Sequence, residues 1–125
     1  MKENNTESCG ALVLNYNHGD YIQNTINSMI NQTVPFDQIL IIDDCSTDKS
    51  VEIISKLISK KKNMTLIKNT INTGVIANLN KGTELLKSKY IYFVSADDDY
   101  NTNIAQAFEE AISLYPNIAM ISGNV

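Results

Sequence analysis

The fold is decided by residues 39 to 48, which read Ile39-Leu40-Ile41-Ile42-Asp43-Asp44-Cys45-Ser46-Thr47-Asp48. Four consecutive apolar residues, three of them isoleucine, lead into two adjacent carboxylates. A continuous run of mainly β-branched residues predicts a strand that is buried on both faces, which is typical of a parallel sheet. The two acids follow the carboxyl end of this strand, where open α/β sheets bind ligands. The stretch therefore predicts the fold class and the edge of the sheet that carries the function.

The rest of the chain repeats the alternation of a short apolar strand and an amphipathic helix. Residues 1–10 are expected to form a flexible leader before one domain of residues 11–125. Further strands are expected at 11–14, 64–67, 90–94 and 118–121, and helices at 22–30, 51–58, 75–86 and 104–115. Ser46 or Thr47 is expected to cap the second helix, with Asp48 in its first turn. This order predicts a doubly wound, mainly parallel α/β sheet with helices on both faces and right-handed crossovers.

The composition limits the classes of function. The chain has 125 residues, of which 43% are hydrophobic and 19% charged, as in one globular domain. Its net charge of -4 argues against general nucleic-acid binding. The sequence has no apolar segment typical of a signal peptide or a membrane span, and its two cysteines lack the spacing of a zinc site. We expect a cytoplasmic protein, with the inner face of the membrane as a further location for a full-length protein.

Three consecutive acids, Asp97-Asp98-Asp99, follow the strand expected at residues 90–94. Carboxylates placed together repel one another unless a cation or hydrogen-bond donors satisfy them, and hard oxygen ligands suit Mg²⁺ or Mn²⁺. Such an ion could bridge to a pyrophosphate. The alternative is an acidic capping cluster for the helix that starts near Thr102. Composition alone leaves both interpretations open.

The pair Asp43-Asp44 also allows two interpretations. A carboxylate at a strand end could accept the single N–H on the pairing edge of uracil, or the pair could cap the following helix. Tyr16 could stack on a base or cover the core, and the single histidine, His18, is expected to be exposed in a polar turn. The sequence contains neither GxxxxGK[ST] nor a GxGxxG after the first strand, which favours metal-assisted binding of a diphosphate.

Six segments, taken in order, resemble the amino-terminal half of family 2 glycosyltransferases with the GT-A fold. They are Leu14-Asn15-Tyr16-Asn17, Ser28-Met29-Ile30-Asn31-Gln32-Thr33, Ile42-Asp43-Asp44-Cys45-Ser46-Thr47-Asp48, Asn72-Thr73-Gly74-Val75, Asn80-Lys81-Gly82 and Phe93-Val94-Ser95-Ala96-Asp97-Asp98. The resemblance implies an inverting transferase that uses a nucleotide-sugar donor, often UDP-linked, with Mn²⁺ or Mg²⁺. It covers nearly all of residues 11–125.

The resemblance also implies a set of site residues. Asp44 corresponds to the acid that recognises uracil, and Asp97, followed by Asp98, corresponds to the metal ligand of the D-x-D motif. The implied nucleotide-binding residues are Asn15, Tyr16, Asn17, Asp43, Asp44, Gly74, Asn80 and Ala96. Two positions depart from the family pattern, since the first acid of D-x-D is Ser95 and an arginine common before the Asn-x-Gly segment is Leu79.

The resemblance ends before the acceptor-binding half and the catalytic base, which are expected beyond Val125. We therefore expect the donor-binding part of a longer transferase, whose acceptor is a saccharide or a lipid-linked saccharide. This piece should bind nucleotide weakly with metal and show no transfer alone. The alternatives are a metal-dependent nucleotide-binding module without transferase activity and a phosphoacceptor receiver domain. The receiver is disfavoured because its acid pair should follow the first strand, where Asn15-Tyr16-Asn17 stands instead.

Overall fold

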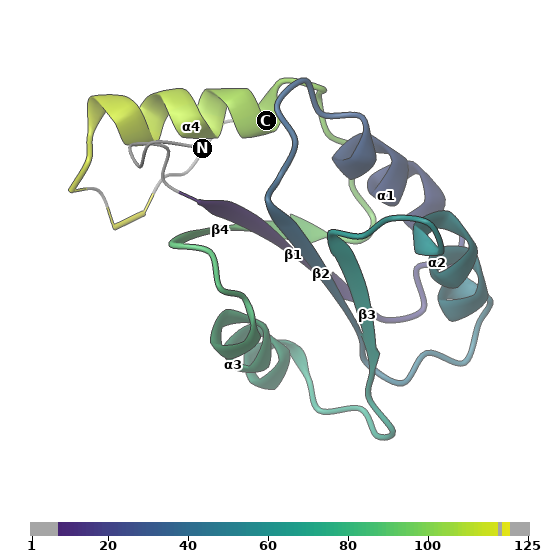
Figure 1. Cartoon of the computed structure of the whole chain (residues 1–125). Helices are drawn as coiled ribbons and strands as arrows, with labels where there is room; N and C mark the ends of the chain where they lie inside the picture. Colours follow the sequence, from purple (N-terminus) through teal and green to yellow (C-terminus); the bar gives the residue numbers. More distant parts are fainter. Residues whose placement is uncertain (1–7, 118, 121–125) are drawn as a thin grey trace.

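A computed structural model describes residues 8–117 and 119–120 of the chain. Its centre is a four-stranded sheet in the order β3-β2-β1-β4, in which every neighbouring pair is parallel (Figure 1). The strands are β1 (Cys9–Asn15), β2 (Gln38–Asp43), β3 (Met64–Lys68) and β4 (Tyr90–Ser95). The chain passes from β1 to β2 to β3 and then crosses to the other side of β1 for β4. The carboxyl ends of all four strands therefore lie at one edge, with a topological switch point between β1 and β4.

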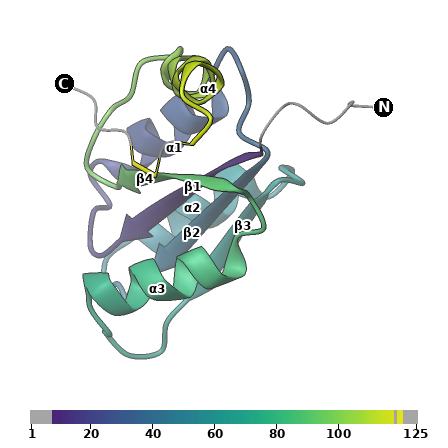
Figure 2. The same ribbon diagram turned by 90° about the vertical axis from the view of Figure 1, so that its left-hand side faces the viewer.

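Four helices cover both faces of this sheet. They are α1 (Ile22–Ile30), α2 (Ser50–Ile58), α3 (Val75–Leu85) and α4 (Ile104–Leu114). Figure 2 shows α1 and α4 on one side of the sheet and α3 on the other. Residues of α1, α2 and α4 share one buried cluster with the sheet, whereas the other face packs against α3. The doubly wound α/β fold predicted from the sequence is confirmed.

The alternation of β2 side chains explains why its sequence is apolar without interruption. Ile39 and Ile41 pack in the cluster beneath α1 and α2, whereas Leu40 and Ile42 pack on the opposite face. All four side chains are at most 3% exposed. Successive residues of a strand point to opposite faces, so a strand covered on both sides must be apolar at every position.

The first strand begins two residues earlier than expected. Cys9 and Gly10, assigned from the sequence to the flexible leader, form the start of β1, and Cys9 is 1% exposed. The backbone N–H of Cys9 donates to Asp37 Oδ2 at 2.8 Å, and Gly10 pairs with Gln38 of β2. Residues 1–7 lie outside the described part of the chain. Of the fifth expected strand, Ile118 and Ile121 also lie outside it, and the described residues 119–120 are not in a strand.

The capping predicted for the second helix is wrong. The helix begins at Ser50, so Ser46 and Thr47 lie in the preceding loop, and Asp48 precedes the first turn. Asp48 Oδ1 instead accepts the backbone N–H of Ser50 at 2.9 Å.

No helix in the described part of the chain is long and apolar enough to cross a membrane.

Candidate functional site

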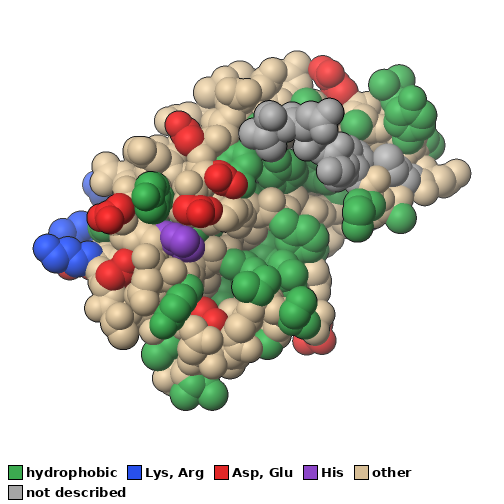
Figure 3. Space-filling view, turned by 180° about the vertical axis from the view of Figure 1, so that it is seen from behind, with side chains coloured by type: hydrophobic (Ala, Val, Ile, Leu, Met, Phe, Trp, Pro, Cys, Tyr) green, Lys and Arg blue, Asp and Glu red, His purple; other side chains and the backbone are tan. Residues whose placement is uncertain are grey.

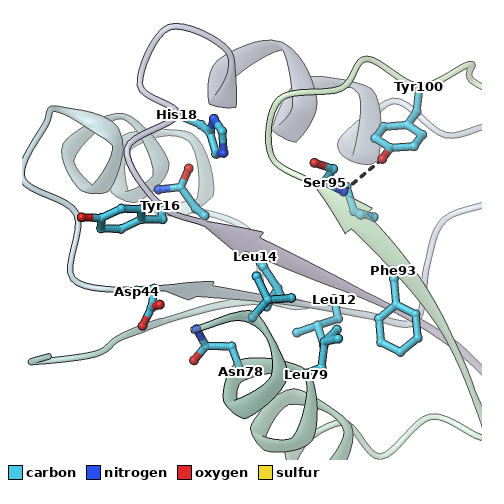
Figure 4. Close-up of a pocket in the computed structure, with 13 residues that line it drawn as sticks. Leu12, Leu14, Tyr16, His18, Asp44, Asn78, Leu79, Phe93, Ser95 and Tyr100 are labelled. Carbon is cyan, nitrogen blue, oxygen red and sulfur yellow. Dashed lines mark hydrogen bonds between the residues drawn. The ribbon is translucent and has the colours of Figure 1, made fainter. Parts of the chain in front are cut away.

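A pocket of about 420 Å³ opens at the carboxyl ends of β1 and β4, at the switch point of the sheet. Its volume lies in the range of ligand-binding pockets. Figure 4 shows Tyr16 and His18 after β1, Asp44 after β2, Ser95 at the end of β4 and Asn78 on α3 around the same space. The lining residues are Leu12, Leu14, Asn15, Tyr16, His18, Asp44, Val75, Asn78, Leu79, Phe93, Val94, Ser95 and Tyr100.

Asp44 is held at the amino-terminal end of α3 by hydrogen bonds from the loop that precedes this helix. Its Oδ1 accepts from Asn69 Nδ2 and the Thr73 backbone N–H, both at 2.9 Å, and from Thr73 Oγ1 at 3.2 Å. Its Oδ2 accepts from the Gly74 backbone N–H at 2.9 Å. The carboxylate therefore serves α3 and its preceding loop rather than capping α2, which was the alternative left open by the sequence.

The surroundings of Asp44 keep its carboxyl group ionised. Burial by itself raises the pKa of Asp44, but the hydrogen bonds from Thr73, Asn69, Gly74 and Asn78 outweigh it. The pKa of this group consequently lies well below its usual range. Figure 4 shows the amide nitrogen of Asn78 on the side that faces Asp44. A fixed negative charge, able only to accept hydrogen bonds, thus lines the pocket at neutral pH.

Asp43, the neighbour of Asp44, is directed into the protein. Asn15 and Asp43 are each 1% exposed, and Asn15 Nδ2 donates to Asp43 Oδ1 at 2.7 Å and to Ser50 Oγ at 2.9 Å. Asp43 Oδ2 accepts the backbone N–H of Ser46 at 2.9 Å. Asp43 therefore fixes the loop after β2. Asn15 is among the residues that line the pocket, whereas Asp43 is not.

Asn17 joins the loops that follow β1 and β2. Its backbone adopts a left-handed conformation with φ 55°, which asparagine tolerates better than most residues. Its Oδ1 accepts the backbone N–H of Thr47 at 2.8 Å, and Asp48 Oδ2 accepts that of Gly19 at 2.8 Å. These bonds fix the loop that presents Tyr16, whose side chain is 47% exposed at the pocket.

The acidic residues 97–99 form an exposed turn after β4. Ser95 Oγ donates to Asp97 Oδ1, and this bond lowers the pKa of the Asp97 carboxyl group. The Tyr100 hydroxyl accepts the backbone N–H of Ser95 at 3.0 Å and lies 3.5 Å from Asp98 Oδ2. Helix α4 starts at Ile104, and within the described chain no acid lies in its first turn. The capping interpretation of the three acids is thus not supported.

The donor chemistry of this turn fits a divalent cation that keeps most of its ligands outside the protein. Among the described residues, no group of three or more acidic, histidine or cysteine side chains could hold a metal by itself. Asp97 nevertheless presents an exposed, ionised carboxylate, and Mg²⁺ is often held by one or two carboxylates together with substrate phosphates and water. Asp97, with Asp98 beside it, fits such an ion better than an all-protein cage.

His18 occupies a more specific place than the sequence predicted. Its side chain is half-buried, lines the pocket and interacts electrostatically with Asp97. In Figure 3 this single histidine lies among acidic side chains at the border of an apolar area. The exposed turn expected from the sequence is therefore part of the pocket wall.

The remaining implied residues occupy three different positions. Gly74 has φ 89°, which permits its backbone N–H to reach Asp44. Ala96 is 1% exposed, and its carbonyl accepts from Thr25 Oγ1. The structure places Asn80 on the exposed side of α3, apart from the residues that line the pocket. Asn78, which the sequence did not single out, is buried in the site two residues earlier.

The profile of the family described as Glycosyl transferase family 2 matches residues 11–121 of the chain. A poly(ribitol-phosphate) beta-glucosyltransferase of Bacillus spizizenii is 37% identical over 86 residues, which are 66% of this chain and 14% of that protein. The uncharacterized glycosyltransferase YibD of Escherichia coli is 33% identical over 116 residues, 89% of this chain and 33% of that protein. The chain thus spans a third or less of the length of these relatives.

A crystal structure of S. aureus TarS residues 1-349 in complex with UDP-GlcNAc superposes on this fold with a TM-score of 0.79. The identity is 26%, and the match covers 87% of this chain and 32% of that one. A crystal structure of the same TarS fragment with UDP gives a TM-score of 0.78 at 26% identity, over 87% of this chain and 33% of that one.

Proposed function

Because the chain belongs to glycosyl transferase family 2, we propose that it is the donor-binding part of a glycosyltransferase that uses a UDP-linked sugar. The observation that carries this proposal is the convergence of Tyr16, Asp44 and Ser95 on one pocket at the switch point of the sheet. Tyr16 offers an aromatic face to a base, and Asp44 offers a carboxylate to the pairing edge of that base. The acidic turn close by would hold a metal ion beside the diphosphate. The TarS complexes with UDP and UDP-GlcNAc support the same donor class.

The hydrogen bonds of Asp44 favour uracil over the other bases. Its Oδ1 already accepts three hydrogen bonds and Oδ2 accepts one from Gly74, while the Asn78 amide also contributes a hydrogen bond to this carboxylate. Each carboxylate oxygen has about two lone-pair sites, so at most one site on Oδ2 remains for an incoming donor. Uracil offers a single N–H on its pairing edge, guanine offers two adjacent donors, and cytosine presents an acceptor at the same ring position. One open acceptor site suits uracil best.

Asp97, with Asp98, would hold Mn²⁺ or Mg²⁺ beside the diphosphate. The ion would supply positive charge to a leaving nucleoside diphosphate. Asp97 suits this role because its carboxylate is exposed and ionised at the same edge as Tyr16 and Asp44. Ser95, in place of the first acid of the family motif, keeps the Asp97 carboxylate oriented through its hydroxyl group.

The reaction we propose for the whole protein is a single displacement that inverts the anomeric carbon. The acceptor hydroxyl oxygen bonds to that carbon, the bond to the diphosphate breaks, and a base takes the hydroxyl proton. In this chain Tyr16 and Asp44 bind and orient the donor, and no residue in the described part of the chain is assigned as the base. We propose a saccharide or a lipid-linked saccharide as the acceptor, and the relative named for poly(ribitol-phosphate) supports a polymeric acceptor.

Calorimetric titration of the chain with UDP, in the presence and absence of Mn²⁺, tests this proposal. We expect Mn²⁺ to tighten UDP binding, and Asp97→Ala to remove the dependence on metal without removing metal-free binding. GDP and CDP should bind more weakly than UDP. A chain that binds the three diphosphates equally, or an Asp97→Ala variant that responds to Mn²⁺ as the parent does, would contradict the assignment. Transfer by a longer protein containing this chain separates the transferase from a nucleotide-binding module without activity.

A further inference from the structure

Helix α1 carries a set of polar side chains that the proposed donor site does not use. Thr25, Ser28 and Gln32 are spaced along one side of this helix and its end, and all three are buried. Buried polar groups in an apolar cluster require hydrogen-bond partners. The partners of Thr25 and Gln32 lie about 70 residues further along the chain, in the turn that carries Asp97 and in the segment leading to α4.

Thr25 fixes the backbone on both sides of Asp97. Its Oγ1, which is completely buried, lies 2.9 Å from the carbonyl oxygen of Ala96 and 2.5 Å from that of Asp98. The hydroxyl group has one proton, which it can donate to either of the two carbonyl groups that flank Asp97, and the Tyr21 carbonyl oxygen lies 3.4 Å away as a weaker acceptor. Both carbonyl oxygens point toward α1, while the Asp97 side chain is exposed. The backbone of the turn is therefore tied to this hydroxyl group, while Ser95 orients the Asp97 carboxylate itself.

Gln32 fixes the other end of the same segment. Its Nε2 donates to the carbonyl oxygen of Asn101 at 2.7 Å, and its Oε1 accepts the backbone N–H of Ala105 at 2.9 Å. The N-cap residue of α4, Asn103, makes no side-chain capping bond in the described structure. Gln32 therefore satisfies one of the free N–H groups at the start of α4 from a different helix. The segment between β4 and α4 passes along α1 in Figures 1 and 2.

We propose that Thr25 and Gln32 are positioning residues for the donor diphosphate, which they serve by holding the turn that presents Asp97 and Asp98. This inference rests on the proposed function, because it assigns the two side chains to the metal-dependent part of the donor site. The uridine part of the site is built from other elements, the loops after β1 and β2 and the start of α3. Removal of the Thr25 hydroxyl group or of the Gln32 amide group should therefore weaken the metal-dependent part of UDP binding and leave the metal-free part unchanged.

The test uses Thr25→Val, which keeps the shape of the side chain and removes the hydroxyl group, and Gln32→Met. The latter removes both loop bonds and the bond from Gln32 Nε2 to the Ser28 carbonyl oxygen. Partners that orient metal ligands are typically worth about 10–100-fold in metal affinity. We expect each variant to weaken UDP binding in Mn²⁺ about tenfold, at the low end of that range. Binding of UDP without metal should stay within about twofold of the parent. Thr25→Ser, which retains the hydroxyl group, should behave as the parent does.

Ser28→Ala is the matched control. Ser28 Oγ donates to the carbonyl oxygen of Thr25 within α1, at 2.7 Å, so its removal disturbs the same buried region without touching the turn. This variant should keep the parent's response to Mn²⁺. Thermal unfolding of every variant shows which of them are folded. If Thr25→Val does not fold, the effect on metal-dependent UDP binding is judged from Gln32→Met.

Three outcomes would overturn the inference: folded variants that keep the full response to Mn²⁺, an equal loss in Ser28→Ala, or a failure of both loop variants to fold. The last result would mean that these bonds serve the fold as a whole. A parent chain whose UDP binding ignores Mn²⁺ is a different result. It refutes the metal assignment of the proposed function itself, before any variant is compared.

Discussion

Replacement of Asp44 by asparagine should change which pyrimidine nucleotide the chain prefers. The amide of Asp44→Asn has one acceptor oxygen and one donor nitrogen in place of two acceptor oxygens. The oxygen can keep the position of Oδ1, where Asn69 and Thr73 donate. The nitrogen then takes the position of Oδ2 and faces the backbone N–H of Gly74.

The size of the effect follows from these bonds. One hydrogen bond to a charged group is lost and the N–H of Gly74 is left facing a donor, which should cost about 1–3 kcal/mol of unfolding free energy. The same nitrogen would face the N–H of uracil, and a comparable penalty corresponds to a loss of about ten- to a hundredfold in UDP affinity. The ring nitrogen of cytosine is an acceptor at that position, so CDP should gain relative to UDP.

Calorimetric titration of parent and variant with UDP and CDP measures this preference directly. The parent should favour UDP, and Asp44→Asn should reverse or abolish that preference. Asp20→Asn is the control, because it removes the same charge at an exposed residue outside the pocket lining and should leave the ratio unchanged. If Asp44→Asn keeps the parent's ratio of UDP to CDP affinity, the assignment of Asp44 to the pairing edge is refuted.

Three further predictions concern the fold. Gly82→Ala should lower the unfolding free energy by about 1 kcal/mol in urea denaturation, because overpacking outweighs the gain in helix propensity. A Cβ at Gly82 would lie 2.4 Å from a methyl group of the fully buried Leu12. If Gly82→Ala is as stable as the parent, Leu12 can move to make room and the prediction is wrong. A thiol reagent should label Cys45 but not Cys9 in the native chain, since burial and the nearby Glu109 and Asp37 raise the pKa of Cys9 to about 12; labelling of both cysteines before unfolding would contradict this. Acid should destabilise the parent more steeply than Asp44→Asn below about pH 5, because the unfolded state, with the ordinary carboxyl pKa, binds a proton that the folded Asp44 does not. If the curves of unfolding free energy against pH are parallel for the parent and Asp44→Asn, the prediction that folding lowers the pKa of Asp44 is refuted.

The strands and their shared edge could be predicted because the signal is local. An uninterrupted apolar run marks β2, and regular helical spacing marks α1 and α4. The start of α2 was misplaced because residues 46–50 contain several side chains able to cap a helix. Only the tertiary structure shows that Ser46 bonds Asp43 instead.

The division of roles within the site could not be predicted from the sequence. Asp43 and Asp44 are adjacent and chemically identical, yet the first is directed into the buried cluster around Asn15 and the second lines the pocket. The family resemblance implied Asn80 on α3, but the turn of the helix decides that Asn78 faces the pocket and Asn80 does not. Gln32 caps a helix that starts 72 residues later in the chain, a pairing that no local pattern encodes.

A uridine diphosphate should bind at the carboxyl edge of the sheet, between the loops after β1, β2 and β4. Backbone amide shifts measured by NMR during titration with UDP and diamagnetic Mg²⁺ report where the nucleotide binds. We expect the largest changes at Tyr16, Asp44 and residues 95–98. Changes concentrated at the opposite edge, around the groove lined by Gln38, Lys62 and Lys87, would contradict it.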